Sequence, residues 1–230
     1  MPDRKSLAPR LVRRGLPALL VPVVLLFIPA GTLKFWQGWA FMAVNLVCPL
    51  LLVILFYKRD PQLLERRLLK EEKIAEQKIV MKLAALFYCA FFVLAGCDFR
   101  FGWSRAWVGM APLWLTLLAL AVVLGGQLFT LWVMDVNRFA SRIIQIEAGQ
   151  KLATTGPYQF VRHPMYSASV VIWFAAAPAL GSYVAWPVCV LFFAVIVFRL
   201  LNEEKLLRRE LPGYGEYCLR TRWRLIPFVW

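Results

Sequence analysis

The densest set of side chains that could do chemistry lies in a polar and aromatic run between two long apolar segments. The run reads Gly156-Pro157-Tyr158-Gln159-Phe160-Val161-Arg162-His163-Pro164-Met165-Tyr166. Proline holds the residue before it in extended backbone and suits the first turn of a helix, so a helix is predicted to begin at Pro164. Its free N–H groups and positive dipole end would suit an anion, with Arg162 and His163 just outside it. The plainer alternative is a loop that only caps the helix.

A second candidate group lies where the last apolar segment ends. Arg199 and Glu203 are four residues apart and therefore share one helix face, and Glu204 follows directly. Ionisable groups at the edge of the hydrocarbon usually have a partner or a task. A carboxylate pair can bind the hydroxyls of a ribose, and a guanidinium can hold a substrate carboxylate through two hydrogen bonds. The alternative is that Arg199 reaches the membrane interface while the glutamates cap the helix.

Other kinds of site are poorly supplied. The chain has one histidine and five scattered cysteines without a Cys-x-x-Cys pair, so neither a metal site nor a disulfide framework is expected. No glycine-rich loop typical of dinucleotide or phosphate binding is present. Any cofactor must therefore be held by the polar loop, the C-terminal tail and the helix ends.

The elements that position these groups are predicted to be membrane helices. Of the 230 residues, 61% are hydrophobic and 17% are charged, whereas soluble domains are about half apolar and a quarter charged. The apolar segments cover residues 16–33, 39–57, 79–96, 107–134, 165–180 and 182–201. The fifth, as a helix, rises only about 24 Å against about 30 Å of hydrocarbon, so the last two are expected to form a hairpin. We predict an all-α polytopic transmembrane bundle of about six helices with a cytoplasmic cofactor pocket.

The net charge of +14 is interpreted as a signal of topology. If the N-terminus is cytoplasmic and the chain crosses six times, the outer loops hold only Lys34, Arg100 and Arg105 of the 27 basic residues. This asymmetry follows the positive-inside rule and disfavours a nucleic-acid partner. We expect both termini in the cytoplasm, contacts with membrane lipids, and an N-terminal uncleaved anchor. The membrane is expected to be the bacterial inner membrane or, failing that, the endoplasmic reticulum.

Four motifs together resemble the membrane methyltransferases that include isoprenylcysteine carboxyl methyltransferase and the phospholipid amine methyltransferases. They are Gly156-Pro157-Tyr158, Arg162-His163-Pro164-Met165-Tyr166, Arg199-x-x-x-Glu203-Glu204, and a tail running from Tyr214-Gly215-Glu216-Tyr217 to Arg224-Leu225-Ile226-Pro227. The resemblance covers residues 137–227. The chain would then divide into an N-terminal four-helix transmembrane region, 1–134, and a catalytic methyltransferase region, 135–230.

The resemblance implies S-adenosylmethionine as cofactor. The implied cofactor contacts are Gln145, Gln150, Lys151, Leu152, Ala153, Tyr158, His163, Pro164, Met165, Tyr166 and Glu203. Arg199, Arg162 and Glu204 are the implied catalytic residues, with Arg199 facing the substrate. Two positions depart from the family pattern: Ala168 stands where many relatives have glycine, and Gln150 where the isoprenylcysteine enzymes often have histidine. The spacing from Gln145 to Gln150 is also shorter than in those enzymes.

The implied reaction is methyl transfer to a lipophilic or prenylated substrate that enters from the bilayer. A carboxylate acceptor, such as that of an isoprenylcysteine, needs no general base, whereas a neutral amine would need Glu203, Glu204 or Tyr166 to take its proton. Arg199 favours the carboxylate. Three alternatives stay open: a phospholipid amine N-methyltransferase, an NADPH-dependent membrane reductase of sterols or enoyl lipids, and a transporter or assembly factor. The last is disfavoured because transporters tend to place charges at mid-membrane.

Overall fold

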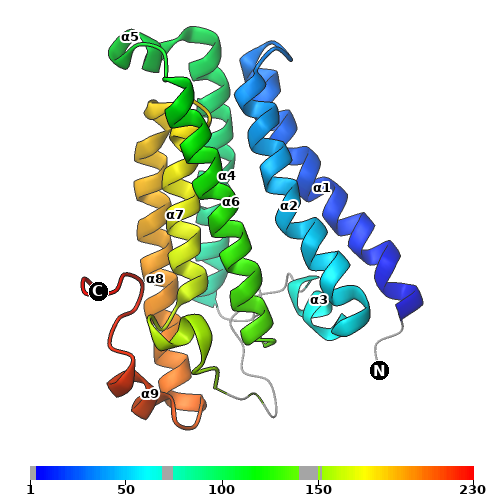
Figure 1. Ribbon diagram of the computed structural model, residues 1–230, viewed down its shortest axis with the longest axis vertical. Coiled ribbons are helices and arrows are strands. Elements are labelled where there is room, and N and C mark those ends of the chain that lie inside the picture. Colours follow the sequence, from blue (N-terminus) through cyan, green and yellow to red (C-terminus); the bar gives the residue numbers. More distant parts are fainter. Residues whose placement is uncertain (1–3, 69–74, 140–149, 151) are drawn as a thin grey trace.

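The computed structural model describes residues 4–68, 75–139, 150 and 152–230, and this part of the chain forms helices without any strand (Figure 1). The long helices are α1 (Arg4–Ala30), α2 (Trp36–Arg59), α4 (Ala75–Phe101), α6 (Leu113–Val136) and α8 (Trp186–Glu210). The shorter ones are α3 (Pro61–Leu68), α5 (Trp103–Val108), η1 (Gly156–Gln159), α7 (Pro164–Ala179), η2 (Tyr183–Ala185) and α9 (Tyr214–Arg220). The predicted all-α fold is confirmed.

Five of the described helices are long and apolar enough to cross a membrane, the last of them extending over Tyr183–Glu210. The apolar helix α7 has only 16 residues, as expected for the fifth segment. The chain is therefore a multi-pass integral membrane protein. Its α7–α8 hairpin turns through residues 180–185, but α7 packs more extensively on α6 than on α8, while α8 packs on α4.

The structure corrects two predicted helix bounds. The first helix begins at Arg4 rather than at Leu16, because the basic N-terminal residues continue the same helix. The fourth was predicted as one helix over 107–134, but α5 ends at Val108 and α6 begins at Leu113. Gly109 has φ 77° there, a backbone region that glycine adopts readily, and Pro112 is the N-cap of α6. These two residues break the apolar segment into two helices.

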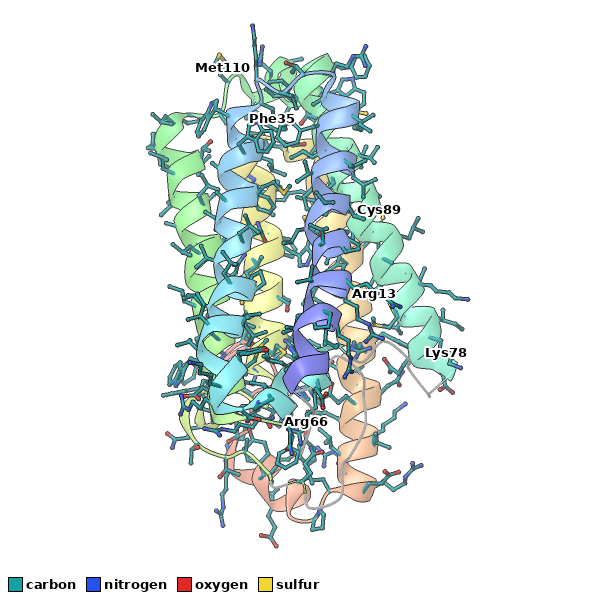
Figure 2. The ribbon with its side chains drawn as sticks, turned by 90° about the vertical axis from the view of Figure 1, so that its right-hand side faces the viewer. Arg13, Phe35, Arg66, Lys78, Cys89 and Met110 are labelled. Carbon is teal, nitrogen blue, oxygen red and sulfur yellow. The ribbon has the colours of Figure 1, made fainter. Side chains whose placement is uncertain are left out.

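The two ends of the bundle differ in chemistry. α3 and α9 lie at one end, which we call the polar end, and α5 lies at the other (Figure 1). Figure 2 shows Arg66 and Lys78 toward the polar end, and Phe35 and Met110 at the opposite end. Five of the exposed tryptophans stand on helix segments at this opposite end: Trp36 and Trp39 at the start of α2, Trp103 and Trp107 in α5, and Trp186 at the start of α8. Such a set is typical of a membrane–water interface.

A buried hydrogen-bond cluster ties the helical hairpin to α4 at this opposite end. The Asp98 carboxylate accepts hydrogen bonds from the backbone N–H of Ser104 (2.7 Å) and from its hydroxyl (2.5 Å). The Ser104 hydroxyl in turn accepts hydrogen bonds from the backbone N–H groups of Tyr183 (2.8 Å) and Val184 (3.2 Å). The turn at which α7 ends and α8 begins is thus fixed far from the polar end.

Replacing Gly96 with alanine is expected to lower the thermal stability of the bundle. A Cβ atom at this position would collide with the backbone oxygen of Leu26 in α1 and lie 3.1 Å from the Pro29 Cβ. Because backbone cannot rotate aside, α1 and α4 must separate, at a cost of about 1–3 kcal/mol. The matched control is Gly125→Ala in α6, where nothing lies within 4 Å. Thermal unfolding in nanodiscs, followed by circular dichroism, should show a lower midpoint for Gly96→Ala alone; equal midpoints would contradict the close packing.

Candidate active site

The N-terminus of α7 is held in place by the C-terminal tail. His163 is the N-cap residue, with φ −126° and ψ 64°, and Pro164 is the first helical residue, as predicted. The backbone N–H of Arg162 donates to the Trp223 oxygen (2.8 Å), and that of His163 donates to the Arg224 oxygen (3.0 Å). The loop before α7 and the tail, some sixty residues apart in the sequence, therefore form one structural unit at the polar end.

A buried ion cluster lies beneath this unit. The Glu204 side chain, from α8, has one carboxylate oxygen 3.1 Å from Arg162 Nη1 and 3.3 Å from His163 Nε2. Its other oxygen accepts a hydrogen bond from Arg224 Nε at 3.1 Å. Glu204 and Arg162 are only 4% and 7% exposed. Because burial makes an unpaired charge very costly, these partners are what permits a carboxylate here.

A second polar group connects three helices around the Tyr166 hydroxyl. The hydroxyl donates to Glu203 Oε2 at 2.6 Å and accepts from Arg199 Nε at 3.0 Å. Arg199 Nη1 also donates to Gln77 Oε1, in α4, at 3.2 Å. Arg199 and Glu203 thus share one face of α8, as their spacing predicted. We call Gln77, Tyr166, Arg199 and Glu203 the Arg199 cluster.

The two consecutive glutamates do not act on the same partner. Glu203 contacts Tyr166, whereas Glu204 contacts the buried cations. Successive residues of a helix point about 100° apart, which separates the two carboxylates. Of these two carboxylates, Glu204 belongs to the ion cluster, and Glu203 is the one whose contacts lie outside it.

An aromatic cluster covers the same end of the molecule. Tyr158, Tyr214 and Tyr217 pack together with Leu152. The Tyr158 hydroxyl accepts a hydrogen bond from Asn137 Nδ2 at 2.9 Å, and its backbone oxygen accepts one from the Tyr217 hydroxyl at 2.7 Å. Burial raises the pKa of Tyr158 to about 12, although the Asn137 hydrogen bond opposes the shift, and burial also raises the pKa of Tyr214 and Tyr217. Burial therefore favours the neutral form of these phenols.

The structure brings most of the predicted site residues together at the polar end. These are Tyr158, Arg162, His163, Pro164, Met165, Tyr166, Arg199, Glu203 and Glu204, with Leu152 in the aromatic cluster. Gln150 and Ala153 are described in the loop before η1, and both are partly buried. Gln145 and Lys151 lie outside the described residues.

Several neighbours of the site were not predicted. Arg67, in α3, has its Nη2 atom 3.6 Å from Met165 Sδ. Asn137 holds the Tyr158 hydroxyl, and Gln77 reaches Arg199 from α4. Arg224 lies inside the quoted tail motif, but no role was predicted for it. Gln77 stands between Glu76 and Lys78 in a charged stretch, and nothing in its sequence context marks it.

The residues present fit a sulfonium cofactor. The Glu203 carboxylate can accept hydrogen bonds from a ribose, and the faces of Tyr158 and Tyr166 can attract a cation. Within the described ranges, no three His, Cys, Asp or Glu side chains are grouped to hold a metal ion.

One family model matches part of the chain. Residues 114–212 match the model of the phospholipid methyltransferase family. This range contains η1, α7, α8 and all of α6 except its first residue. The nickel-cobalt-cadmium resistance protein NccN of Alcaligenes xylosoxydans xylosoxydans is 26% identical over 120 residues, which are 52% of this chain and 52% of that protein. The chain thus matches about half the length of this curated relative. The family match supports a membrane methyltransferase in general.

Proposed function

The family match over residues 114–212 confirms the predicted resemblance to membrane methyltransferases, and from this premise we propose that the protein transfers a methyl group from S-adenosylmethionine to the carboxylate of a lipophilic substrate such as an isoprenylcysteine. The observation that carries the proposal is the Arg199 cluster. It places a guanidinium and a carboxylate on one face of α8, on either side of the Tyr166 hydroxyl.

On the cofactor side, S-adenosylmethionine supplies a methyl group that is already activated by a positively charged sulfur. Glu203, Tyr158, Tyr166 and the residues around His163 are the groups proposed to hold it. The chain's remaining work is to position the acceptor and to exclude water. We assign Arg162 and Glu204 a positioning role, because their side chains bind each other inside the ion cluster.

On the acceptor side, Arg199 is proposed to hold the substrate carboxylate. A carboxylate attacks through an oxygen lone pair and releases no proton, so no general base is required. A guanidinium can orient such a group through parallel hydrogen bonds. An amine acceptor is the second candidate, because the Tyr166–Glu203 hydrogen bond offers a route for its proton.

We further propose that the polar end faces the cytoplasm of a bacterial inner membrane, with both termini on that side. The support is the contrast between the charged polar end and the exposed tryptophans of the opposite end. The cofactor would enter from the cytoplasm, and the substrate would enter sideways from the bilayer among the membrane lipids.

The proposed function is tested by binding and by transfer. Full-length protein in nanodiscs is titrated calorimetrically with S-adenosylhomocysteine, and absence of binding at millimolar ligand would refute the cofactor assignment. Labelled S-adenosylmethionine is then supplied with either N-acetyl-S-farnesylcysteine or dioleoyl-phosphatidylethanolamine. Methylation of the first supports the carboxylate acceptor, and methylation of only the second supports the amine.

Replacing Glu203 with alanine is expected to weaken S-adenosylhomocysteine binding about tenfold or more, because a charged hydrogen-bond acceptor is lost. The control is Glu210→Ala, an exposed glutamate further along α8 whose contact is Arg209. Calorimetry of both variants gives the comparison. An unchanged dissociation constant for the Glu203 variant would remove this residue from the cofactor site.

A further inference from the structure

Gln77 is a buried polar residue in a charged and exposed stretch. It lies in the first turn of α4 and is 0% exposed, whereas its neighbours Glu76 and Lys78 are exposed. The residue precedes the family match of 114–212. Its amide oxygen accepts the hydrogen bond from Arg199 Nη1. Its amide nitrogen, Nε2, is buried and has no hydrogen-bond partner among the residues that the structure describes.

The contact with Arg199 fixes which way the Gln77 amide faces. A guanidinium has only donors, so it must meet the amide oxygen and not the NH₂ group. The NH₂ group therefore takes no part in this hydrogen bond. It is bonded to the same carbon as the oxygen that Arg199 binds. The Gln77 NH₂ group of α4 and the Arg199 guanidinium of α8 consequently lie side by side.

An unsatisfied buried donor carries a penalty of about 1–3 kcal/mol. Most buried polar side-chain atoms of folded proteins have a partner, so an exception next to a functional cluster requires an explanation. A bound group with oxygen acceptors would supply the missing partner. An ammonium group would not, because it has only donors. The single lone pair of a neutral amine is the one that must attack the methyl group, so it is not available to the Gln77 NH₂ group during transfer.

We propose that Gln77 is a specificity residue of the acceptor site, whose NH₂ group donates a hydrogen bond to one oxygen of a substrate carboxylate while Arg199 binds the other. This inference rests on the proposed function and deepens it. One charged and one neutral donor hold the carboxylate in a defined orientation without adding a second positive charge, so the carboxylate stays nucleophilic. Gln77 thereby selects an acid acceptor over an amine.

The test uses full-length protein in nanodiscs and two substitutions at one position. Gln77→Glu keeps the size of the side chain but replaces the donor with a carboxylate that repels an acid and competes for Arg199. Gln77→Met keeps the length and removes the donor. The matched control is Glu76→Gln, a change at the exposed neighbour on the same turn. Methyl transfer is measured with N-acetyl-S-farnesylcysteine and with dioleoyl-phosphatidylethanolamine.

For the acid probe, N-acetyl-S-farnesylcysteine, Gln77→Glu is expected to raise KM about tenfold or more, and Gln77→Met about threefold, with smaller changes in kcat. The Glu76→Gln control should match the wild type. The affinity for S-adenosylhomocysteine should stay within about twofold in all three variants, because Gln77 is assigned to the acceptor and not to the cofactor. Any methyl transfer to the amine probe, dioleoyl-phosphatidylethanolamine, should be unaffected or increased by Gln77→Glu.

Two results would overturn the inference. One is an unchanged KM for the acid probe in Gln77→Glu. The other is an equal loss with both probes, or a loss of cofactor affinity, either of which indicates a merely structural residue. Direct titration of N-acetyl-S-farnesylcysteine against wild type and Gln77→Glu needs no methyl transfer. Selective weakening there supports the role of Gln77 even if S-adenosylhomocysteine fails to bind and the proposed function fails; equal affinities overturn the role.

Discussion

Replacing Arg199 with alanine is expected to lower kcat/KM for N-acetyl-S-farnesylcysteine about a hundredfold or more, and to leave the affinity for S-adenosylhomocysteine within about threefold. The side chain contacts Tyr166 and Gln77, and we propose that it also binds the substrate carboxylate. Glu203, the proposed cofactor contact, keeps its own hydrogen bond from Tyr166 in the variant. The Arg199→Ala variant should therefore lose recognition of the acceptor and keep its binding of the cofactor.

Two further variants make this result specific. Arg199→Lys retains the charge but loses the planar donor pair, so it should recover only part of the lost kcat/KM. Arg208→Ala removes an exposed arginine from the same helix and should behave as the wild type. Steady-state kinetics at saturating S-adenosylmethionine measures all three. A parallel loss of cofactor affinity in Arg199→Ala would show that the guanidinium organises the whole site instead of the acceptor alone.

The membrane helices could be predicted because long apolar runs have few other structures available in a bilayer. Their ends were harder to predict, because helix ends depend on local backbone. The segment 107–134 carries no charged residue, and only Gly109 and Pro112 indicate that it forms two helices. In α1 the basic residues before Leu16 continue the helix, which hydropathy alone does not indicate.

The arrangement of the candidate site residues could be predicted where their motif is local. Arg162, His163 and Pro164 are adjacent, and Arg199 and Glu203 are one helical turn apart, so spacing alone indicated their arrangement. Gln77 could not be found in this way, since its contact with Arg199 depends on the packing of α4 against α8. The same holds for the different directions of Glu203 and Glu204, which depend on where the tail and α7 lie around α8.

Replacing Glu204 with alanine is expected to cost about 3–5 kcal/mol of stability, because one partner of a buried ion cluster is removed. Arg162 and Arg224 would be left close together without their shared carboxylate, and the His163 Nε2 atom would lose its contact with Glu204 and keep the one with the Tyr214 hydroxyl. The repulsion between the two guanidinium groups pushes the tail away from the N-terminus of α7. Cofactor binding should then fall together with stability, in contrast to Arg199→Ala.

A comparison of Glu204→Ala with two further variants of glutamates in α8 separates the effect of the position from the effect of the charge. Glu204→Gln keeps an oxygen acceptor for one arginine but not the negative charge, so its loss should be intermediate. Glu210→Ala changes an exposed glutamate and should be neutral. Thermal unfolding in nanodiscs gives the order of stability, and limited trypsin digestion reports release of the tail at Arg220, Arg222 and Arg224. If Glu204→Ala unfolds at the wild-type temperature and its tail resists trypsin, the ion cluster does not hold the tail against α7, and the arginines must find their compensation elsewhere.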